Sequence, residues 1–461
     1  MVSNQSSIVN TQFEHFEALY PDIARFAEIE KILSFVKEGH SCQLIGVPGT
    51  GRSNLLGLLP YNRNIRIKHL GDNQKWFHFV LLNFSEIRKK PLLDATKFMF
   101  LGLLDSLRER KMNKEYNAVN TIFKEGIGLN DEMVLFQGLK KTIDFLAVEK
   151  ELTIVFLFDR FEEYIPTVTS DFFANLRILR NRAKYRFSVV FSANRPLDDM
   201  LEPVFFADFY EFMAGKIVYL PILDKPGLDF RISYLEKITG EKIDKKILAE
   251  IMKLTGGHGS LTRHSLEAIL AEATFDVVAG NEQLNTIPKL VEFFLKQKPI
   301  RSVLFGIWNS LDPFEQNLLT LLNFTDQDIS YLRNVGLIDK NKLTIPLLKE
   351  YALEKNKLLP ENEKIVFDES ANEIKKGNLI ISDKLTSSEF KLLKFFILNA
   401  EKTIDRDEIV GAVWKNLEST AGVTDQALDQ LVFRLRKKIE NDPNTPRHIQ
   451  TIKGRGFRFS S

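Results

Sequence analysis

A glycine-rich stretch near the start of the chain, GVPGTGRS, carries the residue types that bind phosphate. It fits the spacing G-x-x-x-x-G-K-[ST], except that an arginine stands where the pattern has lysine. Glycines allow successive backbone N–H groups to surround phosphate oxygens at the start of a helix, and the final hydroxyl can hold Mg²⁺. The predicted phosphate-binding residues are Gly46, Gly49, Thr50, Gly51, Arg52 and Ser53, and Ser53 is also a predicted magnesium ligand.

Arg52 is the one departure from that pattern. Lysine reaches the β- and γ-phosphates as a compact point charge, whereas arginine brings a broader planar fork. Arg52 keeps the charge of the lysine but not its shape. We therefore expect it to support phosphate binding better than it aligns the transition state of hydrolysis. The sequence leaves open whether a bound nucleotide is hydrolysed slowly or not at all.

A second chemical signal is the apolar run Ile154 to Phe158, which Asp159 closes. Such a run predicts a strand buried on both faces of a parallel sheet, and an acid at its carboxyl end lies where ligands bind. Asp159 is therefore a predicted magnesium ligand, with Glu162 or Glu163 to polarise the attacking water. The alternative is a buried strand followed by the acidic start of a helix, where carboxylates are favoured anyway.

A third apolar strand is predicted to begin at Phe187 and to run into Asn194 and Arg195. Polar side chains at this sheet edge lie where a γ-phosphate would be sensed, so both are candidate nucleotide contacts. A plain turn before Pro196 is the alternative.

Together these residues resemble the P-loop ATPases of the AAA+/STAND branch, in which the nucleotide is commonly a switch and turnover is slow. The resemblance implies a parallel-sheet ATPase core over residues 19–215, after an extension over 1–18, and a helical lid over 216–299. It implies ATP or ADP with Mg²⁺ as cofactors. The stretch GGHGSL resembles the opening of a lid helix, where His258 would face the nucleotide; a simple helix-start turn is the alternative.

Residues 300–354 predict two or three short helices and a hairpin around Lys340-Asn341. This module resembles the winged helix that follows the ATPase in STAND proteins, and it lacks a concentrated basic helix. We therefore expect it to pack on the nucleotide domain rather than to bind DNA. A charged, polar linker over 355–363 separates it from the last domain, 364–461.

The net charge of +2 hides a basic C-terminal end. From Gln430 onward, eight lysines and arginines stand against Glu440 and Asp442, which indicates a polyanionic partner; a solvated charged face is the alternative. A capping box is predicted at Thr386 and Glu389. A later helix has Leu428, Val432, Leu435 and Ile439 at core spacing, and a hairpin closes the chain.

These C-terminal elements closely resemble the OmpR/PhoB-type winged helix-turn-helix, on the stretches LTSSEFKLLKFF, VTDQALDQLVFRLRKKIE and IQTIKGRGFRF. The resemblance implies that the basic helix enters the major groove of double-stranded DNA and that the hairpin touches the minor groove. It also implies a set of contact residues: Gln426, Gln430, Arg434, Arg436, Lys437, Thr451, Lys453 and Arg455. Leu431 and Phe433 depart from the family, whose members often have polar readers there.

The predicted fold class is thus multidomain α/β plus winged helices: a P-loop ATPase core with a helical lid, a middle winged helix and a C-terminal OmpR-type domain. The predicted function is DNA-binding transcription regulation under an ATP/ADP switch, as a homo-oligomer on repeated sites, with RNA polymerase as a further partner. The alternatives are a replication-initiator-like ATPase of the origin-recognition kind and a turnover NTPase in defence or repair. With one cysteine, no long apolar run and no signal peptide, we expect a cytoplasmic protein without a membrane partner.

Overall fold

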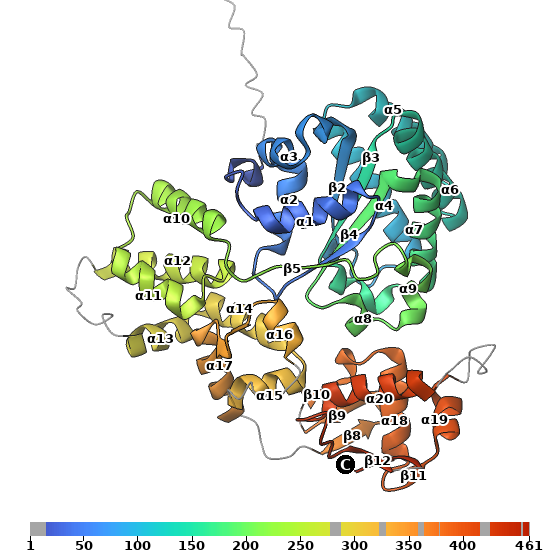
Figure 1. The fold of residues 1–461 in the computed structure, drawn as a ribbon, viewed down its shortest axis with the longest axis vertical. Helices are drawn as coiled ribbons and strands as arrows, with labels where there is room; N and C mark the ends of the chain where they lie inside the picture. Colours follow the sequence, from blue (N-terminus) through green and yellow to red (C-terminus); the bar gives the residue numbers. More distant parts are fainter. Residues whose placement is uncertain are drawn as a thin grey trace, which may run out of the picture.

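The structure is a computed structural model that describes residues 15–276, 287–321, 329–357, 364–377, 379–414, 425–452 and 455–460. Four parts follow one another along the chain (Figure 1): an α/β domain, a helical subdomain, a middle module and a C-terminal domain. Within the described ranges, no helix combines the length and the hydropathy that crossing a bilayer requires.

A five-stranded sheet forms the centre of the α/β domain, in the order β2-β3-β4-β1-β5, and every neighbouring pair is parallel. The strands are β1 (Cys42–Ile45), β2 (Phe77–Asn83), β3 (Thr153–Asp159), β4 (Phe187–Ala193) and β5 (Ile217–Tyr219). The register pairs Asn83 with Asp159 and Ile45 with Ala193. The glycine loop, Asp159 and Asn194 therefore lie at one edge of the sheet, the carboxyl edge at which ligands bind in open α/β folds.

Helices cover both faces of this sheet (Figure 1). Phe156 and Phe158 of β3 join a buried cluster with the helices of one face, and Val155 and Leu157 join a second cluster on the other. Successive strand residues point to opposite faces, so burial on both sides explains the unbroken apolar run. The helices are α1 (Phe26–Lys37), α2 (Arg52–Tyr61), α3 (Arg63–Leu70), α4 (Leu92–Glu109), α5 (Asn113–Ile127), α6 (Glu132–Ile143), α7 (Ser170–Ala183), α8 (Leu197–Met200) and α9 (Pro203–Tyr210).

The helical subdomain and the middle module share one hydrophobic core. Leu254 and Leu261 of the former lie in the same buried cluster as Leu304 and Leu347 of the latter, and the cluster reaches Val47 in the glycine loop. The subdomain consists of α10 (Lys225–Thr239), α11 (Lys245–Thr255), α12 (Gly259–Asp276) and α13 (Ile287–Lys296). The loop is thus packed directly against the elements that follow the sheet.

The middle module has the predicted helices and hairpin. Lys340 and Asn341 form the hairpin tip with φ angles of 45° and 60°, as a two-residue type I′ turn requires. Asp312 and Glu315 cap α15 reciprocally through side-chain to backbone hydrogen bonds of 2.8 and 2.9 Å. The elements are α14 (Lys298–Asn309), α15 (Pro313–Leu321), α16 (Ser330–Asn334), β6 (Ile338–Asp339), β7 (Lys342–Leu343) and α17 (Pro346–Lys357).

The C-terminal domain is the predicted winged helix-turn-helix. The capping box at Thr386 and Glu389 is present, and Leu428 and Val432 are buried in the domain core. Leu431, at a position where readers of DNA are common, is also a core residue at 1% exposure. The elements are β8 (Ile365–Asp368), β9 (Glu373–Lys376), β10 (Leu379–Ile380), α18 (Ser387–Leu398), β11 (Thr403–Ile404), α19 (Arg406–Val413), α20 (Asp425–Ile439), β12 (Ile449–Ile452) and β13 (Gly456–Phe459).

Candidate nucleotide site and nucleic-acid interface

The loop between β1 and α2 has the backbone that a phosphate cradle requires. Gly49 and Gly51 have φ angles of +85° and +103°, a region in which residues with a Cβ are strained. A Cβ on Gly49 would also lie 2.7 Å from Cε1 of His258. Thr50 Oγ1 closes the loop by donating to a loop carbonyl at 2.8 Å. Helix α2 begins at Arg52, so its positive dipole end points into the loop.

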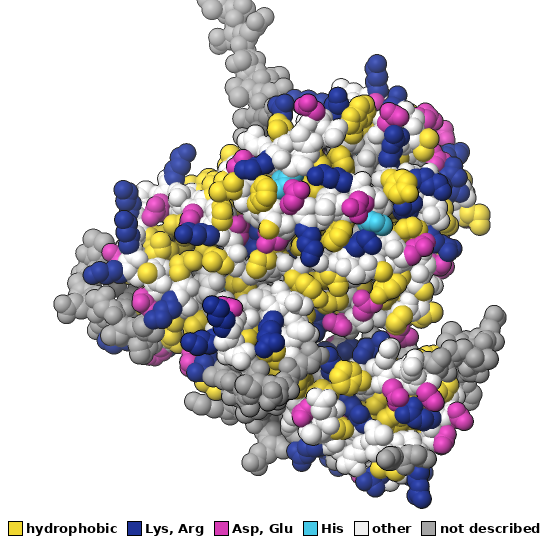
Figure 2. Space-filling view, in the orientation of Figure 1, with side chains coloured by type: hydrophobic (Ala, Val, Ile, Leu, Met, Phe, Trp, Pro, Cys, Tyr) yellow, Lys and Arg dark blue, Asp and Glu magenta, His cyan; other side chains and the backbone are white. Residues whose placement is uncertain are grey.

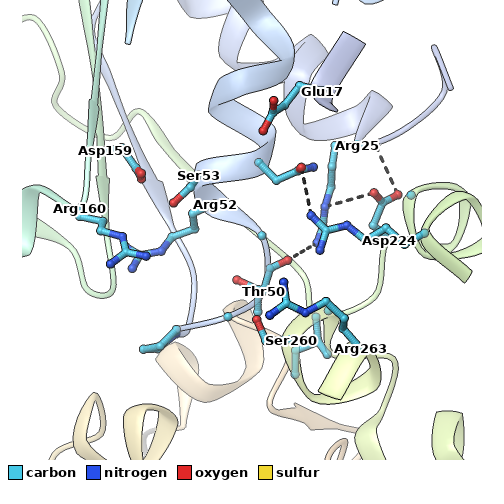
Figure 3. Close-up of a pocket in the computed structure, with 18 of the residues that line it drawn as sticks. Glu17, Arg25, Thr50, Arg52, Ser53, Asp159, Arg160, Asp224, Ser260 and Arg263 are labelled. Carbon is cyan, nitrogen blue, oxygen red and sulfur yellow. Dashed lines mark hydrogen bonds and ion pairs between the residues drawn. The ribbon is translucent and has the colours of Figure 1, made fainter. Parts of the chain in front are cut away.

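This loop forms one side of a cavity of about 710 Å³ (Figure 3), a size typical of small-molecule sites. Gly46, at the start of the loop, packs against Leu220 and is not among the residues that line the cavity. The remaining predicted loop residues line it, as do predicted residues at the end of β3 and after β3 and β4: Gly49, Thr50, Gly51, Arg52, Ser53, Asp159, Glu162, Glu163 and Asn194.

Ser53 and Asp159 present oxygen atoms to the same part of the cavity (Figure 3). Asp159 is 5% exposed and accepts a hydrogen bond from Ser192 Oγ at 3.3 Å, which holds its carboxylate in place. Mg²⁺ prefers oxygen ligands. This hydroxyl and this carboxylate would supply two of them, and phosphate oxygens and water would fill the remaining coordination positions. The residues present therefore fit a magnesium–nucleotide complex.

Both candidate catalytic glutamates are engaged by arginines. Arg52 is 8% exposed, and its guanidinium donates to the two carboxylate oxygens of Glu162 at 2.5 and 3.4 Å. Glu163 pairs with Arg88 at 2.8 Å on the surface. Glu162 therefore balances the charge of the arginine at the lysine position.

Replacing Arg52 with alanine is expected to weaken Mg-ATP binding at least tenfold, which corresponds to about 1.4 kcal/mol, because the loop would lose its cation. Isothermal calorimetry on the full chain measures this. Arg88→Ala is the matched control, since it releases Glu163 but removes no residue from the cavity wall. An unchanged affinity in Arg52→Ala would show that the arginine stays on Glu162 and does not serve the nucleotide.

The sequence did not reveal the wall opposite the sheet. Arg25 lies in left-handed backbone and donates to the carbonyl oxygen of Thr50 at 2.8 Å, and its Nε lies 3.6 Å from Asp224. Burial lowers the pKa of Arg25. Arg231 and Arg263, from α10 and α12, also line the cavity. These residues bring cationic groups to the glycine loop from the first helix and the helical subdomain, so they fit a polyphosphate.

Asn194 and Arg195, the two residues after β4 that were predicted to contact a γ-phosphate, have different surroundings in the structure. Asn194 lines the cavity, whereas Arg195 points into the middle module. There its guanidinium binds Glu315, donates to the Ser310 carbonyl at 3.0 Å and lies 4.2 Å from the ring of Tyr331. Arg195 is therefore placed to connect this sheet edge with α15 rather than to contact a phosphate.

His258 contacts the glycine loop and does not line the cavity. Its Nε2 donates to the Pro48 carbonyl at 2.9 Å, and its Nδ1 accepts from the backbone N–H of Leu261 at 3.3 Å. One nitrogen donates and the other accepts, so the ring is the neutral Nε2–H tautomer. Burial lowers the pKa of His258 to about 4.

The depressed pKa of His258 has a consequence for stability. The unfolded chain takes up this proton near the ordinary pKa of 6.5, but the folded chain resists it until about pH 4. The contribution of neutral His258 to the free energy of unfolding is thus complete above pH 6.5. It is lost as the pH falls from 6.5 to 4, and the loss from this group is roughly 3 kcal/mol. Urea unfolding of wild type and His258→Asn tests this: the variant should lose less stability across that window. Equal losses would contradict it.

Helix α20 presents a polar face with the side chains expected to meet DNA. Gln426 and Gln430 are exposed, and Arg434 and Lys437 are half-buried. The Lys437 ammonium lies 5.1 Å from the ring of Phe433, which is 41% exposed. Amide side chains can pair with adenine and cations can bind phosphates, so this face can serve both readout and affinity.

Arg436 connects α20 to the wing, the hairpin that β12 and β13 form. Its guanidinium donates twice to the Ile449 carbonyl, at 2.9 and 2.7 Å, and to Thr451 Oγ1 at 2.8 Å. It therefore orients α20 relative to β12. Arg436 and Thr451 are both predicted DNA contacts, and in this structure they are hydrogen-bonded to each other. Arg455 is exposed at the wing, and Lys453 lies outside the described residues.

The sequence comparisons match the C-terminal domain. Residues 383–459 match the family model "Transcriptional regulatory protein, C terminal". Protein PetR of Rhodobacter capsulatus is 32% identical over 96 residues, which cover 20% of this chain and 40% of that protein. The phosphate regulon regulatory protein PhoB of Klebsiella pneumoniae is 31% identical over 101 residues, 22% of this chain and 42% of PhoB. The chain thus spans less than half the length of these relatives.

Among solved structures, a Walker-type ATPase of Pyrococcus abyssi aligns with 79% of this chain and 95% of its own, at 15% identity and a TM-score of 0.42. The ORC1 protein of Aeropyrum pernix in complex with DNA aligns with 77% of this chain and 90% of its own, at 13% identity and a TM-score of 0.36.

Proposed function

We propose that this protein is a sequence-specific DNA-binding transcription regulator whose N-terminal module is an ATP/ADP switch. One observation carries the proposal: the polar face of α20, joined to the wing through Arg436, within a domain that matches the C-terminal model of transcriptional regulatory proteins. In such domains a helix enters the major groove, and a wing contacts the neighbouring backbone.

The cavity at the glycine loop supports the switch. Its donor set fits Mg²⁺ with ATP or ADP, and the Arg52–Glu162 ion pair favours slow hydrolysis or none, since it occupies the candidate base. The nucleotide would then act by being bound or exchanged rather than by rapid turnover.

A single winged helix covers only a short half-site, so we expect a homo-oligomer on repeated sites, in the cytoplasm, with RNA polymerase as a further partner. A replication initiator of the origin-recognition kind is the alternative. The match of the last domain to transcriptional regulators favours regulation.

Selection of the full chain against a pool of random-sequence DNA duplexes tests this proposal. We expect a short sequence motif to be enriched, and binding to weaken steeply with salt, because lysine and arginine contacts to phosphates release counterions. A pool that stays random after repeated selection at low salt, with and without Mg-ATP, would contradict sequence-specific binding.

A further inference from the structure

The C-terminal domain lies against the rest of the chain through α20 itself. Helix α15 of the middle module packs against α20. A second contact lies between α8 and α9, where Glu202 Oε1 accepts the backbone N–H of Ser388 at 2.8 Å, in the first turn of α18. Figure 1 shows the C-terminal domain below the α/β domain and beside α15.

The cations of α20 that would meet phosphate face carboxylates in this arrangement. Arg434 lies near enough to Asp198 of α8 to stabilise its charged form, and Lys437 does the same for Asp312 at the start of α15. Burial raises the pKa of both Asp198 and Asp312, and these cations oppose that shift. Figure 2 shows lysine and arginine side chains next to acidic ones at this junction.

We propose that Asp198, Glu202 and Asp312 form an acidic docking face for the DNA-reading helix of this same chain, and that docking keeps α20 away from DNA. The proposal rests on the proposed function of α20. Asp198 and Asp312 lie near Arg434 and Lys437, and Glu202 binds the first turn of α18, so the docking face and a DNA duplex compete for the same surface of α20. Attractions between partly exposed charges are individually weak, so the docked state is reversible.

The docking face is also connected to the nucleotide cavity. Asn194 lines the cavity, and the next residue, Arg195, lies 3.8 Å from Asp312, the carboxylate that faces Lys437. Tyr331 donates from its hydroxyl to the Asn194 carbonyl at 2.6 Å. Helix α8, which carries Asp198, begins two residues after Arg195. A phosphate that displaced Asn194 would therefore be expected to shift Asp198, four residues further along the chain, and Asp312 through Arg195.

The first experiment measures DNA affinity of the full chain, without nucleotide, for the random-sequence duplex pool at moderate salt. The double variant Asp198→Asn and Glu202→Gln is expected to bind at least tenfold more tightly than wild type. Asp208→Asn is the matched control for the single variant Asp198→Asn, because each removes one carboxylate and Asp208 of α9 pairs with Arg177 at 2.8 Å within the α/β domain. Equal binding by the double variant and wild type overturns the inference.

A second experiment measures docking directly and does not depend on DNA. The variant Val204→Cys with Ser387→Cys places two exposed thiols near the Glu202–Ser388 hydrogen bond and leaves the Glu202 carboxylate in place; the native Cys42 is buried and does not compete. A short bis-maleimide should cross-link this pair efficiently, and adding Asp198→Asn should lower the yield several-fold. An unchanged yield overturns the docking.

The two experiments together separate the two proposals. If Asp198→Asn lowers the cross-link yield but no variant binds any duplex, the docking face stands and DNA binding by α20 is wrong. If the cross-linked chain binds duplex as well as the free chain, the docking does not shield α20, and the inference is overturned.

Discussion

Replacing Gly49 with alanine is expected to abolish nucleotide binding, with affinity for Mg-ATP and Mg-ADP lowered at least a hundredfold. The residue has a φ of +85°, and a Cβ there would lie 2.7 Å from His258 and 3.0 Å from Ser260. Strain of this kind costs about 1–3 kcal/mol. The clash would also push the helical subdomain away from the loop, so the N–H groups that cradle phosphate would turn out of place. Calorimetry on the full chain measures the loss.

Gly71→Ala is the control for that variant. Gly71 also has a positive φ, of +56°, but a Cβ there would meet nothing within 4 Å, and the residue lies away from the cavity. Both variants carry backbone strain, so thermal unfolding should shift in the same direction, while only Gly49→Ala should lose the nucleotide. Retained nucleotide affinity in Gly49→Ala would mean that the loop is not the phosphate site.

Replacing Arg434 with alanine is expected to lower affinity for the selected duplex by tenfold to a hundredfold. Truncating one base or phosphate contact costs about 1–3 kcal/mol. Adding Gln430→Ala should lower discrimination between the selected sequence and random duplex, because an amide reads base edges and a phosphate contact does not. Fluorescence anisotropy titrations with both duplexes at several salt concentrations measure the two effects.

Lys391→Ala is the matched control for Arg434→Ala. Lys391 is an exposed cation of the same domain, on α18 rather than on α20 or the wing. The two variants change the net charge equally, so any difference reports the position of the charge. Equal losses of affinity would indicate a non-specific charge effect and would contradict a reading role for α20.

The parts of the chain that are encoded locally could be predicted from the sequence. The spacing of Gly46, Gly49 and Gly51 predicts a strand, a loop and a helix, because positive φ angles and a helix start are local properties. The capping box at Thr386 is likewise read from residues three apart. The parallel sheet follows from the apolar run before Asp159, since burial on both faces needs no alternation.

Partners that are far apart in sequence could not be predicted. Nothing in the sequence near Arg52 indicates that Glu162 would hold its guanidinium, or that Arg25 would meet Asp224. Arg195 was expected to face a phosphate because it follows a strand, but its partner lies in another module. Such contacts depend on how elements far apart in the chain pack against one another, which residue spacing alone does not record.

The most direct test of nucleotide control is the affinity of the full chain for its selected duplex without nucleotide, with Mg-ADP and with Mg-ATP, at one salt concentration. If the N-terminal module is a switch for α20, at least two of the three states should differ in affinity for DNA tenfold or more, as a coupling of about 1.4 kcal/mol requires. Equal affinities in all three states, at nucleotide concentrations that calorimetry shows to be saturating, would contradict it.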